Sequence, residues 1–313
     1  MTALFRRPWF WAYVAAALTF VPTAALSQGV GGGWELAAAA LTFASFSVFV
    51  GLGQMTVITM GSGNVDLSIP ATMTLAGTLS LKYMDGVAGT GAMGLAVALA
   101  VGLACGAGNY ALIWLLRIPP IIATLAASFI YQSLAIWSNR GLRIKPPDWL
   151  ATFSTGSTFG LPNVALVALA VTVLFWVLLE RSVYGRWISA IGQNQRAARL
   201  SGVPVDLVRA ATYLLSAVMA GLCGFLLSCF SGGAALNMGA EYLLISIAVV
   251  VIGGSSIAGG NSNVPGIWGA ALFMFLIVSM LNSYGLGAGV RLIMTGVIII
   301  AIVAAASGRR AAP

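Results

Sequence analysis

Residues 163–180 read NVALVALAVTVLFWVLLE, and residues 181–209 continue as RSVYGRWISAIGQNQRAARLSGVPVDLVR. The first stretch has no charged residue before Glu180, and its length is close to the ~20 apolar residues that a helix needs to cross the hydrocarbon core of a bilayer. The second stretch carries five arginines against one aspartate, Asp206. An apolar stretch followed at once by a basic loop predicts a transmembrane helix that ends at a membrane surface.

The composition of the whole chain supports the same interpretation. Of its 313 residues, 60% are hydrophobic and only 7% are charged, and the mean hydropathy is +0.99. Soluble domains have about 25% charged residues, so the chain is predicted to be one integral membrane domain over residues 1–313. The chain contains no histidine, which excludes Ser–His and Cys–His dyads and imidazole metal sites. Neither a catalytic nor a metal site is expected, and the chain is not expected to be an enzyme.

The three cysteines (Cys105, Cys223 and Cys229) lie in apolar runs without CxxC spacing, so they are expected to be small buried hydrophobes. The N-terminal run from Trp9 to Leu26 resembles a signal peptide in part. Its length and its aromatic residues favour a retained first transmembrane helix.

The apolar runs predict an all-α polytopic fold with about ten transmembrane helices, some of them broken. The expected spans are 9–28, 34–60, 67–81, 89–116, 119–137, 163–180, 207–230, 241–253, 264–284 and 288–306. Basic residues concentrate on the cytoplasmic side of membrane proteins. This rule places both termini and the 181–209 loop in the cytoplasm. The 138–162 loop is then external, and it is the expected landing surface for an external partner.

Two polar segments interrupt the apolar pattern, GSGNVDLSIP at 61–70 and GGSSIAGGNSN at 253–263. Irregular backbone at membrane depth must be packed in protein or line a cavity, and paired breaks indicate a transporter. Asp66 or Ser68 is expected to cap the following helix, and Pro70 fits its first turn. The second break lacks the phosphate-loop pattern GxxxxGK[ST], so no nucleotide site is predicted in this chain.

Polar or glycine residues near these breaks are candidates for a translocation pathway or gate. They are Asn64, Asp66, Ser68, Gln54, Gly253, Gly254 and Asn282. A buried carboxylate in a membrane protein is a functional candidate by default. The alternative for Asp66 is helix capping alone, and for the other polar side chains it is ordinary hydrogen bonding between helices.

Within the cytoplasmic loop, the pattern predicts a short helix from Gln195 to Leu200. Asn194 is a suitable N-cap, Gly202 suits the position after the C-cap, and Pro204 stops continuation. A helix of under two turns is not stable alone in water. It is therefore expected to dock on its own chain or on a soluble partner, unless the segment is an ordinary basic loop at the lipid surface.

Four motifs in order resemble the ribose-type ABC sugar importer permeases. Residues 185–203 are similar to that family's coupling loop, G-x-x-x-x-A-I-G-x-N-x-x-A-A-x-L-S-G-[IV]. Residues 66–68 (DLS), 117–125 (RIPPIIATL) and 248–260 (AVVVIGGSSIAGG) are similar to its other motifs. The chain departs from the family at Pro70, where glycine is common, and at residues 261–263. Glu241 does not align with a family motif, so no role is assigned to it.

The resemblance implies a permease of the type II importer class in a bacterial inner membrane. Two permease subunits, identical or different, would form the pathway, and a periplasmic binding protein would deliver a sugar or sugar-like solute. Cytoplasmic ATPase subunits would bind ATP and Mg²⁺, and this chain would bind no cofactor. Arg196 and Arg199 share a helix face. The implied ATPase-coupling residues are Gly192, Asn194, Arg196, Ala197, Ala198, Arg199, Leu200, Ser201, Gly202 and Pro204.

Other classes remain open at this point. An ion-coupled secondary transporter would need a buried ionisable group, for which Asp66 and Glu241 are the candidates. An intramembrane aspartate protease would need a second aspartate, and only Asp66 is suitably placed. A purely structural membrane subunit would show no transport with its partners.

Overall fold

The computed structural model describes residues 8–26, 32–84, 87, 89–139, 144–285, 287, 289–290, 293–298 and 300–301. These residues form a helical bundle with one short β-hairpin, because helices satisfy every backbone polar group internally. The long elements are α2 (Pro8–Leu26), α3 (Gly32–Thr59), α4 (Ile69–Met84), α5 (Gly91–Leu115), α6 (Pro120–Ser138), α8 (Asn163–Glu180), α11 (Val205–Phe230), α12 (Tyr242–Ile252) and α13 (Val264–Ser283). The connecting elements are α7 (Asp148–Thr155), β1 (Ser157–Thr158), β2 (Leu161–Pro162), α9 (Val183–Gln193) and α10 (Gln195–Leu200).

Helices form at nine of the ten predicted spans within the described residues, and in the tenth, 288–306, the residues that are described (289–290, 293–298 and 300–301) are helical as well. Among the described residues, six helices are long and apolar enough to cross a membrane: α3, α5, α6, α8, α11 and α13. The count of ten crossings therefore stays a prediction. The shortest apolar helix, α12, has 11 residues. It would extend about 16 Å, roughly half the thickness of the hydrocarbon core.

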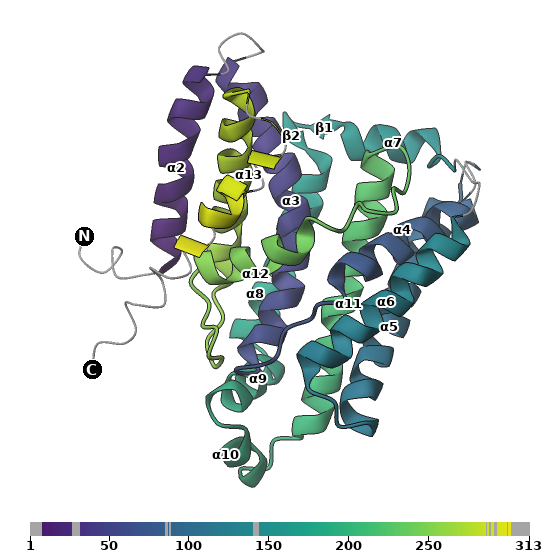
Figure 1. Cartoon of the computed structure of the whole chain (residues 1–313), viewed down its shortest axis with the longest axis vertical. Helices are drawn as coiled ribbons and strands as arrows, with labels where there is room; N and C mark the ends of the chain where they lie inside the picture. The colour runs from purple at the N-terminus through teal and green to yellow at the C-terminus, as the bar shows by residue number, and fades with distance from the viewer. Residues whose placement is uncertain are drawn as a thin grey trace.

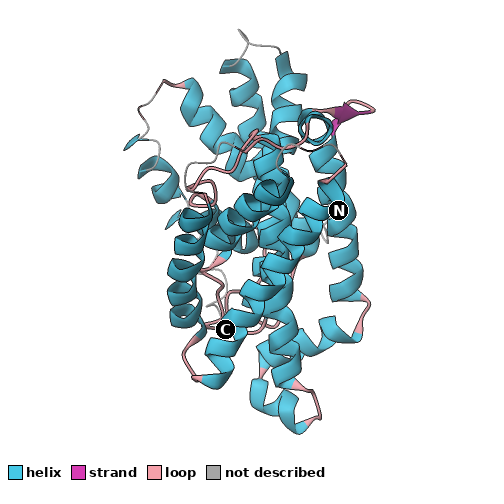
Figure 2. Ribbon diagram, turned by 90° about the vertical axis from the view of Figure 1, so that its right-hand side faces the viewer, coloured by secondary structure: helices cyan, strands magenta, loops and turns pink. Residues whose placement is uncertain are grey.

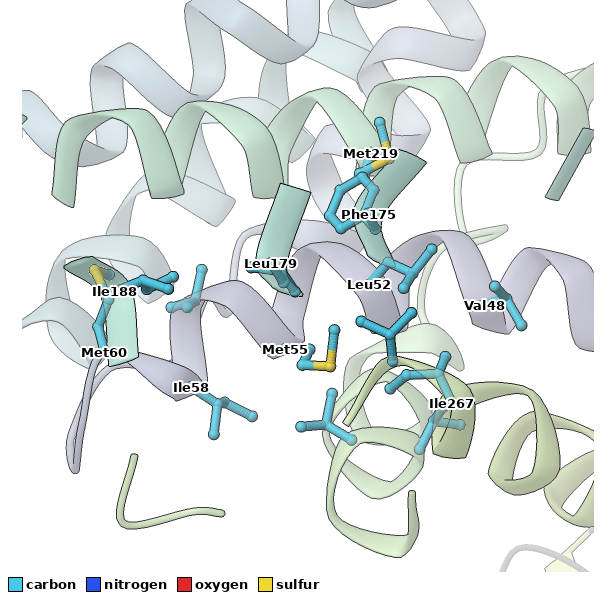
Figure 3. Close-up of a cluster of buried hydrophobic side chains, with 14 of the residues drawn as sticks. Val48, Leu52, Met55, Ile58, Met60, Phe175, Leu179, Ile188, Met219 and Ile267 are labelled. Carbon is cyan, nitrogen blue, oxygen red and sulfur yellow. The ribbon is translucent and has the colours of Figure 1, made fainter. Parts of the chain in front are cut away.

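Helices α3 and α11 form the centre of the bundle. In Figure 1, α2 and α13 lie on one side of α3, and α4, α5 and α6 lie on the other. Figure 3 shows the central contact, where Leu52 and Met55 of α3 lie among Met219 of α11, Ile267 of α13 and Phe175 of α8. All five side chains are buried. This apolar core holds α3, which ends just before the first polar break, against α11, which begins at the end of the cytoplasmic loop.

Glycines allow α5 to pack closely against α11. A Cβ atom on Gly102 would lie 2.7 Å from the carbonyl oxygen of Ala217, and one on Gly106 would lie 2.7 Å from Cα of Leu214. Gly221 of α11 has the same relation to the carbonyl oxygen of Ala98, at 2.6 Å. Small residues that permit backbone contact are the usual means of helix association in membranes. The predicted burial of Cys105, Cys223 and Cys229 is also found, since all three are buried free thiols.

The two loops predicted to lie on opposite sides of the membrane are at opposite ends of the bundle. Helix α7 and the β-hairpin lie at one end, and α9 and α10 at the other (Figures 1 and 2). The hairpin pairs Ser157 with Pro162 and Thr158 with Leu161. At its tip, Phe159 and Gly160 have φ values of +53° and +80°. The Phe159 side chain is 99% exposed.

Candidate coupling loop and polar gate

The predicted short helix of the cytoplasmic loop forms from Gln195 to Leu200 as α10. The Asn194 side chain caps it, because its Oδ1 accepts a hydrogen bond from Ala197 N at 3.0 Å. At the other end, Gly202 has φ +83°. Its N–H donates to Arg199 O at 3.2 Å, and the N–H of Val203 donates to Ala198 O at 3.1 Å. These are the two bonds of a Schellman motif, so α10 is terminated by its own sequence at both ends.

The candidate coupling residues differ in how far they are available to a partner. Arg196 and Ala197 are exposed, and Leu200 is 83% exposed. Ala198, expected to contribute to an apolar contact, is buried in the chain's own core instead. Arg199 forms an ion pair with Asp206 at 3.2 Å. Both side chains are more than half exposed, so this pair adds at most about 1 kcal/mol of stability.

Two further coupling candidates complete the end of α10. The Ser201 hydroxyl donates to the carbonyl oxygen of Ala197 at 3.0 Å. Pro204 directly precedes Val205, the first residue of α11. Since Arg199 of α10 pairs with Asp206 in the first turn of α11, the two helices are tied across this short connection. The end of α10 therefore lies directly beside the start of α11.

Helix α9 fixes the loop to the bundle through one buried face. Ile188 and Ile191 are buried in the central core. The Tyr184 hydroxyl is hydrogen-bonded to Thr212 Oγ1 of α11 at 2.8 Å. Burial raises the pKa of the Tyr184 phenol to about 12, so it stays protonated at neutral pH. Helix α9 is therefore held against the bundle by its buried face and by this hydrogen bond.

The last turn of α9 meets both polar breaks at a contact of main-chain atoms. We define the glycine junction as Gly61, Gly192, Gly259 and Gly260. Gly260 N donates a hydrogen bond to Thr59 O at 2.8 Å. A Cβ atom on Gly192 would overlap Thr59 O and Gly260 N, and one on Gly259 would lie 2.5 Å from Gly61 N. The junction joins the end of α3, the end of α9 and the second break through main-chain atoms, with the Gln193 side chain beside Gly260.

The first break surrounds a buried carboxylate. Asp66 Oδ1 accepts hydrogen bonds from Ser68 N at 3.0 Å, from Ser68 Oγ at 2.7 Å and from Asn109 Nδ2 at 3.5 Å. Its Oδ2 accepts from Ser216 Oγ at 2.9 Å. Gln54 Oε1 accepts from Asp66 N at 3.2 Å. We call these five residues, all fully or almost fully buried, the Asp66 hub.

The hub connects elements that are far apart in the sequence. Gln54 lies on α3, Asn109 on α5 and Ser216 on α11. The Tyr131 hydroxyl on α6 is within hydrogen-bond distance of Asn109 Oδ1, at 3.1 Å, and of Cys105 O, at 2.8 Å. The bond from Ser68 N to Asp66 Oδ1 closes the turn before α4, which begins at Ile69. Capping of α4 by Asp66 or Ser68 stays a prediction. Asp66 also has a wider structural role, because its carboxylate bonds to α5 and α11 and its main-chain N–H bonds to α3.

The other candidate gate residues lie in separate places. Asn64 Oδ1 accepts from the Tyr213 hydroxyl at 3.3 Å, close to the hub. In the second break, Gly253 O accepts from Asn263 Nδ2 at 2.8 Å, and Gly254 adopts φ +90°. Asn282 is exposed near the far end of α13, about 27 Å along the helix from its first residue. The structure therefore brings Gln54, Asn64, Asp66 and Ser68 together, whereas Asn282 is remote from them.

Sequence reasoning missed Asn109, Ser216 and Tyr131. Asn109 carried a usable signal, because it is the single asparagine in a long apolar stretch, where a polar side chain needs a partner. Ser216 and Tyr131 carried none, since serine and tyrosine are common in transmembrane helices. Their role depends on helix packing that no local pattern specifies.

Replacing Asn194 by alanine should loosen α10 without unfolding the protein. Loss of an N-cap costs about 1 kcal/mol. Amide hydrogens of residues 195–200 should therefore exchange about fivefold faster, because 1 kcal/mol changes an opening equilibrium by that factor. Gln195→Ala is the control, since Gln195 is exposed in the same helix and is not the capping residue. Equal exchange in Asn194→Ala and the unchanged protein would refute the role of the cap.

A bundle of apolar helices with two broken segments that meet a basic loop is the architecture of a membrane permease. The chain belongs to the family described as branched-chain amino acid transport system / permease component, whose model matches residues 36–303. No solved structure shows significant similarity to the chain.

The chain is also similar to several named permeases. The chain is 31% identical over 243 residues to the probable ABC transporter permease protein y4mJ of Sinorhizobium fredii, which covers 76% of this chain and 71% of y4mJ. It is 29% identical to the ribose import permease protein RbsC of Escherichia coli K12, over 79% of this chain and 78% of RbsC. It is 27% identical to the autoinducer 2 import system permease protein LsrD of Yersinia enterocolitica, over 87% and 91%. The resemblance to monosaccharide ABC importer permeases is thereby confirmed.

Proposed function

We propose that this chain is the membrane-spanning subunit of an ATP-driven importer for a sugar or sugar-like polar solute. The names of the relatives support the substrate class, since RbsC is a ribose import permease and LsrD an autoinducer 2 import permease. In this proposal a periplasmic protein delivers the solute, a second permease subunit completes the pathway, and a cytoplasmic ATPase binds ATP and Mg²⁺. The chain lies in the bacterial inner membrane with both termini in the cytoplasm.

The glycine junction is the observation that carries the proposed mechanism. Helix α10 presents Arg196 and Leu200 to the cytoplasm, where the ATPase would bind. Closure of the ATPase would push α10 and the rigid α9 behind it. Because the end of α9 touches both breaks through main-chain atoms, the movement would reach both at once. Side chains cannot rotate to absorb the movement at such a contact.

The Asp66 hub would keep the first break in one shape while the junction moves. Its carboxylate already has four hydrogen-bond donors within the protein. A carboxylate with this many protein partners is suited to hold a backbone turn in place. The solute would pass with weak contacts only, since release is part of each cycle and the binding protein supplies the specificity.

Reconstitution tests the proposed function. The chain is placed in proteoliposomes with its ATPase and its binding protein, and uptake of a labelled pentose, hexose and polyol is measured. We expect uptake of at least one solute only when ATP and both partners are present. Uptake that persists without the ATPase and follows a proton or sodium gradient would identify an ion-coupled secondary transporter instead.

The proposed landing surface gives a separate prediction at Phe159. A fully exposed aromatic ring on a tight turn is suited to anchor in a pocket of a partner. Asparagine tolerates the left-handed backbone at this position, so Phe159→Asn should leave the hairpin intact. We expect the affinity for the binding protein to fall by about fivefold or more. Thr155→Ala is the control, since Thr155 is exposed at the end of α7, at the same end of the bundle. Equal affinities for both variants would contradict the prediction.

A further inference from the structure

A cavity of about 630 Å³ lies where α5 ends, α6 begins and α11 begins. We call it the two-arginine pocket. Its polar lining consists of Tyr110, Arg117, Asp206 and Arg209, and Trp114, Ile113 and Ile118 are among its apolar residues. The volume is in the range of small-molecule binding sites. None of the candidate coupling or gate residues lines this pocket.

The pocket carries an excess of positive charge. Its single carboxylate, Asp206, is held by Arg199 at 3.2 Å, and the Asp206 main-chain oxygen accepts from the Tyr110 hydroxyl at 2.7 Å. Among the described residues, Arg199–Asp206 is the only ion pair. Arg117 and Arg209 line the pocket, and neither guanidinium group has a carboxylate partner among the described residues. A bound anion would supply the missing negative charge.

The turn that presents Arg117 has an unusual backbone. Arg117 has φ +53°, a left-handed conformation that non-glycine residues rarely adopt. Pro119 precedes α6 and Pro120 is its first residue, so the turn between α5 and α6 is stiff. The stiff turn between α5 and α6 thus fixes the position of the Arg117 backbone.

The apolar surroundings indicate where the anion comes from. Trp114 is 58% exposed, Leu116 61% and Ile122 58%, on the helix ends beside the pocket. Under the proposed orientation, this level is the cytoplasmic boundary of the bilayer, where exposed tryptophan and basic residues meet lipid headgroups. Basic pockets between transmembrane helices on this side bind anionic headgroups. A small soluble anion has no apolar part that could contact these exposed side chains, whereas a lipid has its acyl chains.

We propose that the two-arginine pocket binds the phosphate group of an anionic phospholipid from the cytoplasmic leaflet. The lipid would bridge the α5–α6 turn through Arg117 and the second turn of α11 through Arg209. Its acyl chains would lie along the exposed apolar ends of α5 and α6. The inference rests on the proposed orientation of the chain, but it requires neither the ATPase nor transport.

Native mass spectrometry of the full chain tests this site. The protein is released from micelles that contain phosphatidylglycerol or phosphatidylcholine, and retained lipid is counted. We expect about tenfold preferential retention of phosphatidylglycerol. The double variant Arg117→Gln/Arg209→Gln should lose most of this preference. Arg181→Gln is the matched control, since Arg181 follows α8 at the same end of the bundle, over the Trp176 ring at 5.4 Å and outside the pocket.

Thermal unfolding of each variant, and the two single variants, show whether a loss of lipid reflects misfolding. Added inorganic phosphate should not displace the lipid if the apolar rim contributes. Equal retention of the two lipids, or a preference that survives in a folded double variant, would overturn the proposal. Loss of ATPase association with intact lipid preference would also overturn it and assign the pocket to the ATPase. Because lipid retention is measured on the isolated chain, it is independent of the transport assay.

Discussion

Gly192→Ala is expected to abolish ATP-driven uptake although alanine is the better helix former by about 1 kcal/mol. The Cβ atom would overlap Thr59 O and Gly260 N and would lie 2.9 Å from Gly260 Cα, so the end of α9 must move away from both breaks. Overpacking of this kind costs about 1–3 kcal/mol. If the cost falls mainly on one of the two gate states, uptake should fall by about 10–100-fold.

The assay must separate lost coupling from lost folding. Uptake, ATPase association and thermal unfolding are measured on the same preparation of Gly192→Ala. Gly33→Ala is the matched control, because Gly33 is in the first turn of α3 and a Cβ atom there meets no atom within 4 Å. We expect Gly192→Ala to bind the ATPase and hydrolyse ATP without solute uptake. Normal uptake in a folded Gly192→Ala protein would show that the glycine junction does not transmit movement.

Asp66→Ala is expected to destabilise the protein by about 3–5 kcal/mol. The substitution leaves the Ser68 N–H, the Ser68 hydroxyl and the Ser216 hydroxyl without their acceptor, and all of these groups are buried. Each buried donor that loses its partner costs about 1–3 kcal/mol, and such costs are not fully additive. The thermal midpoint in detergent and the yield of folded protein both report the loss.

Three variants make the Asp66 prediction specific. Asp148→Ala removes an exposed carboxylate in the first turn of α7 and should change stability little. Asp66→Asn retains one acceptor oxygen and should cost less than Asp66→Ala. The double variant Asp66→Ala/Ser216→Ala should lose less stability than the sum of the losses in the two single variants, since both partners of one hydrogen bond are removed together. Additive costs would show that the carboxylate and Ser216 do not act as a unit.

The features that sequence reasoning predicted well depend on neighbouring residues. Helix α10 has the predicted bounds because its cap at Asn194 and its stop at Gly202 are decided within a few residues. The two polar breaks and the loops at 138–162 and 181–209 were also predicted, since glycine, asparagine and charged residues stand out in an apolar chain. The order of the family motifs pointed to the permease class before any packing was known.

The features that were missed depend on packing between distant segments. The glycine junction joins residues near 60, 192 and 260, and no local pattern states that they touch. Ser216 meets Asp66 because α11 packs at the centre of the bundle. Ala198 was expected to face a partner, but the chain's own core covers it. The number of crossings depends on helix length, which packing also decides: the apolar run at 241–253 forms a helix of only 11 residues, α12.

The exposure of Leu200 has a consequence for the life of the protein in the cell. Its side chain is 83% exposed on α10, in the loop between α8 and α11. Under the proposed function, a chain inserted ahead of the ATPase would present this leucine to water. Exposed apolar side chains of this kind invite aggregation and proteolysis. The supply of the ATPase would then set how much permease survives, and the two subunits would accumulate in proportion without a dedicated regulator.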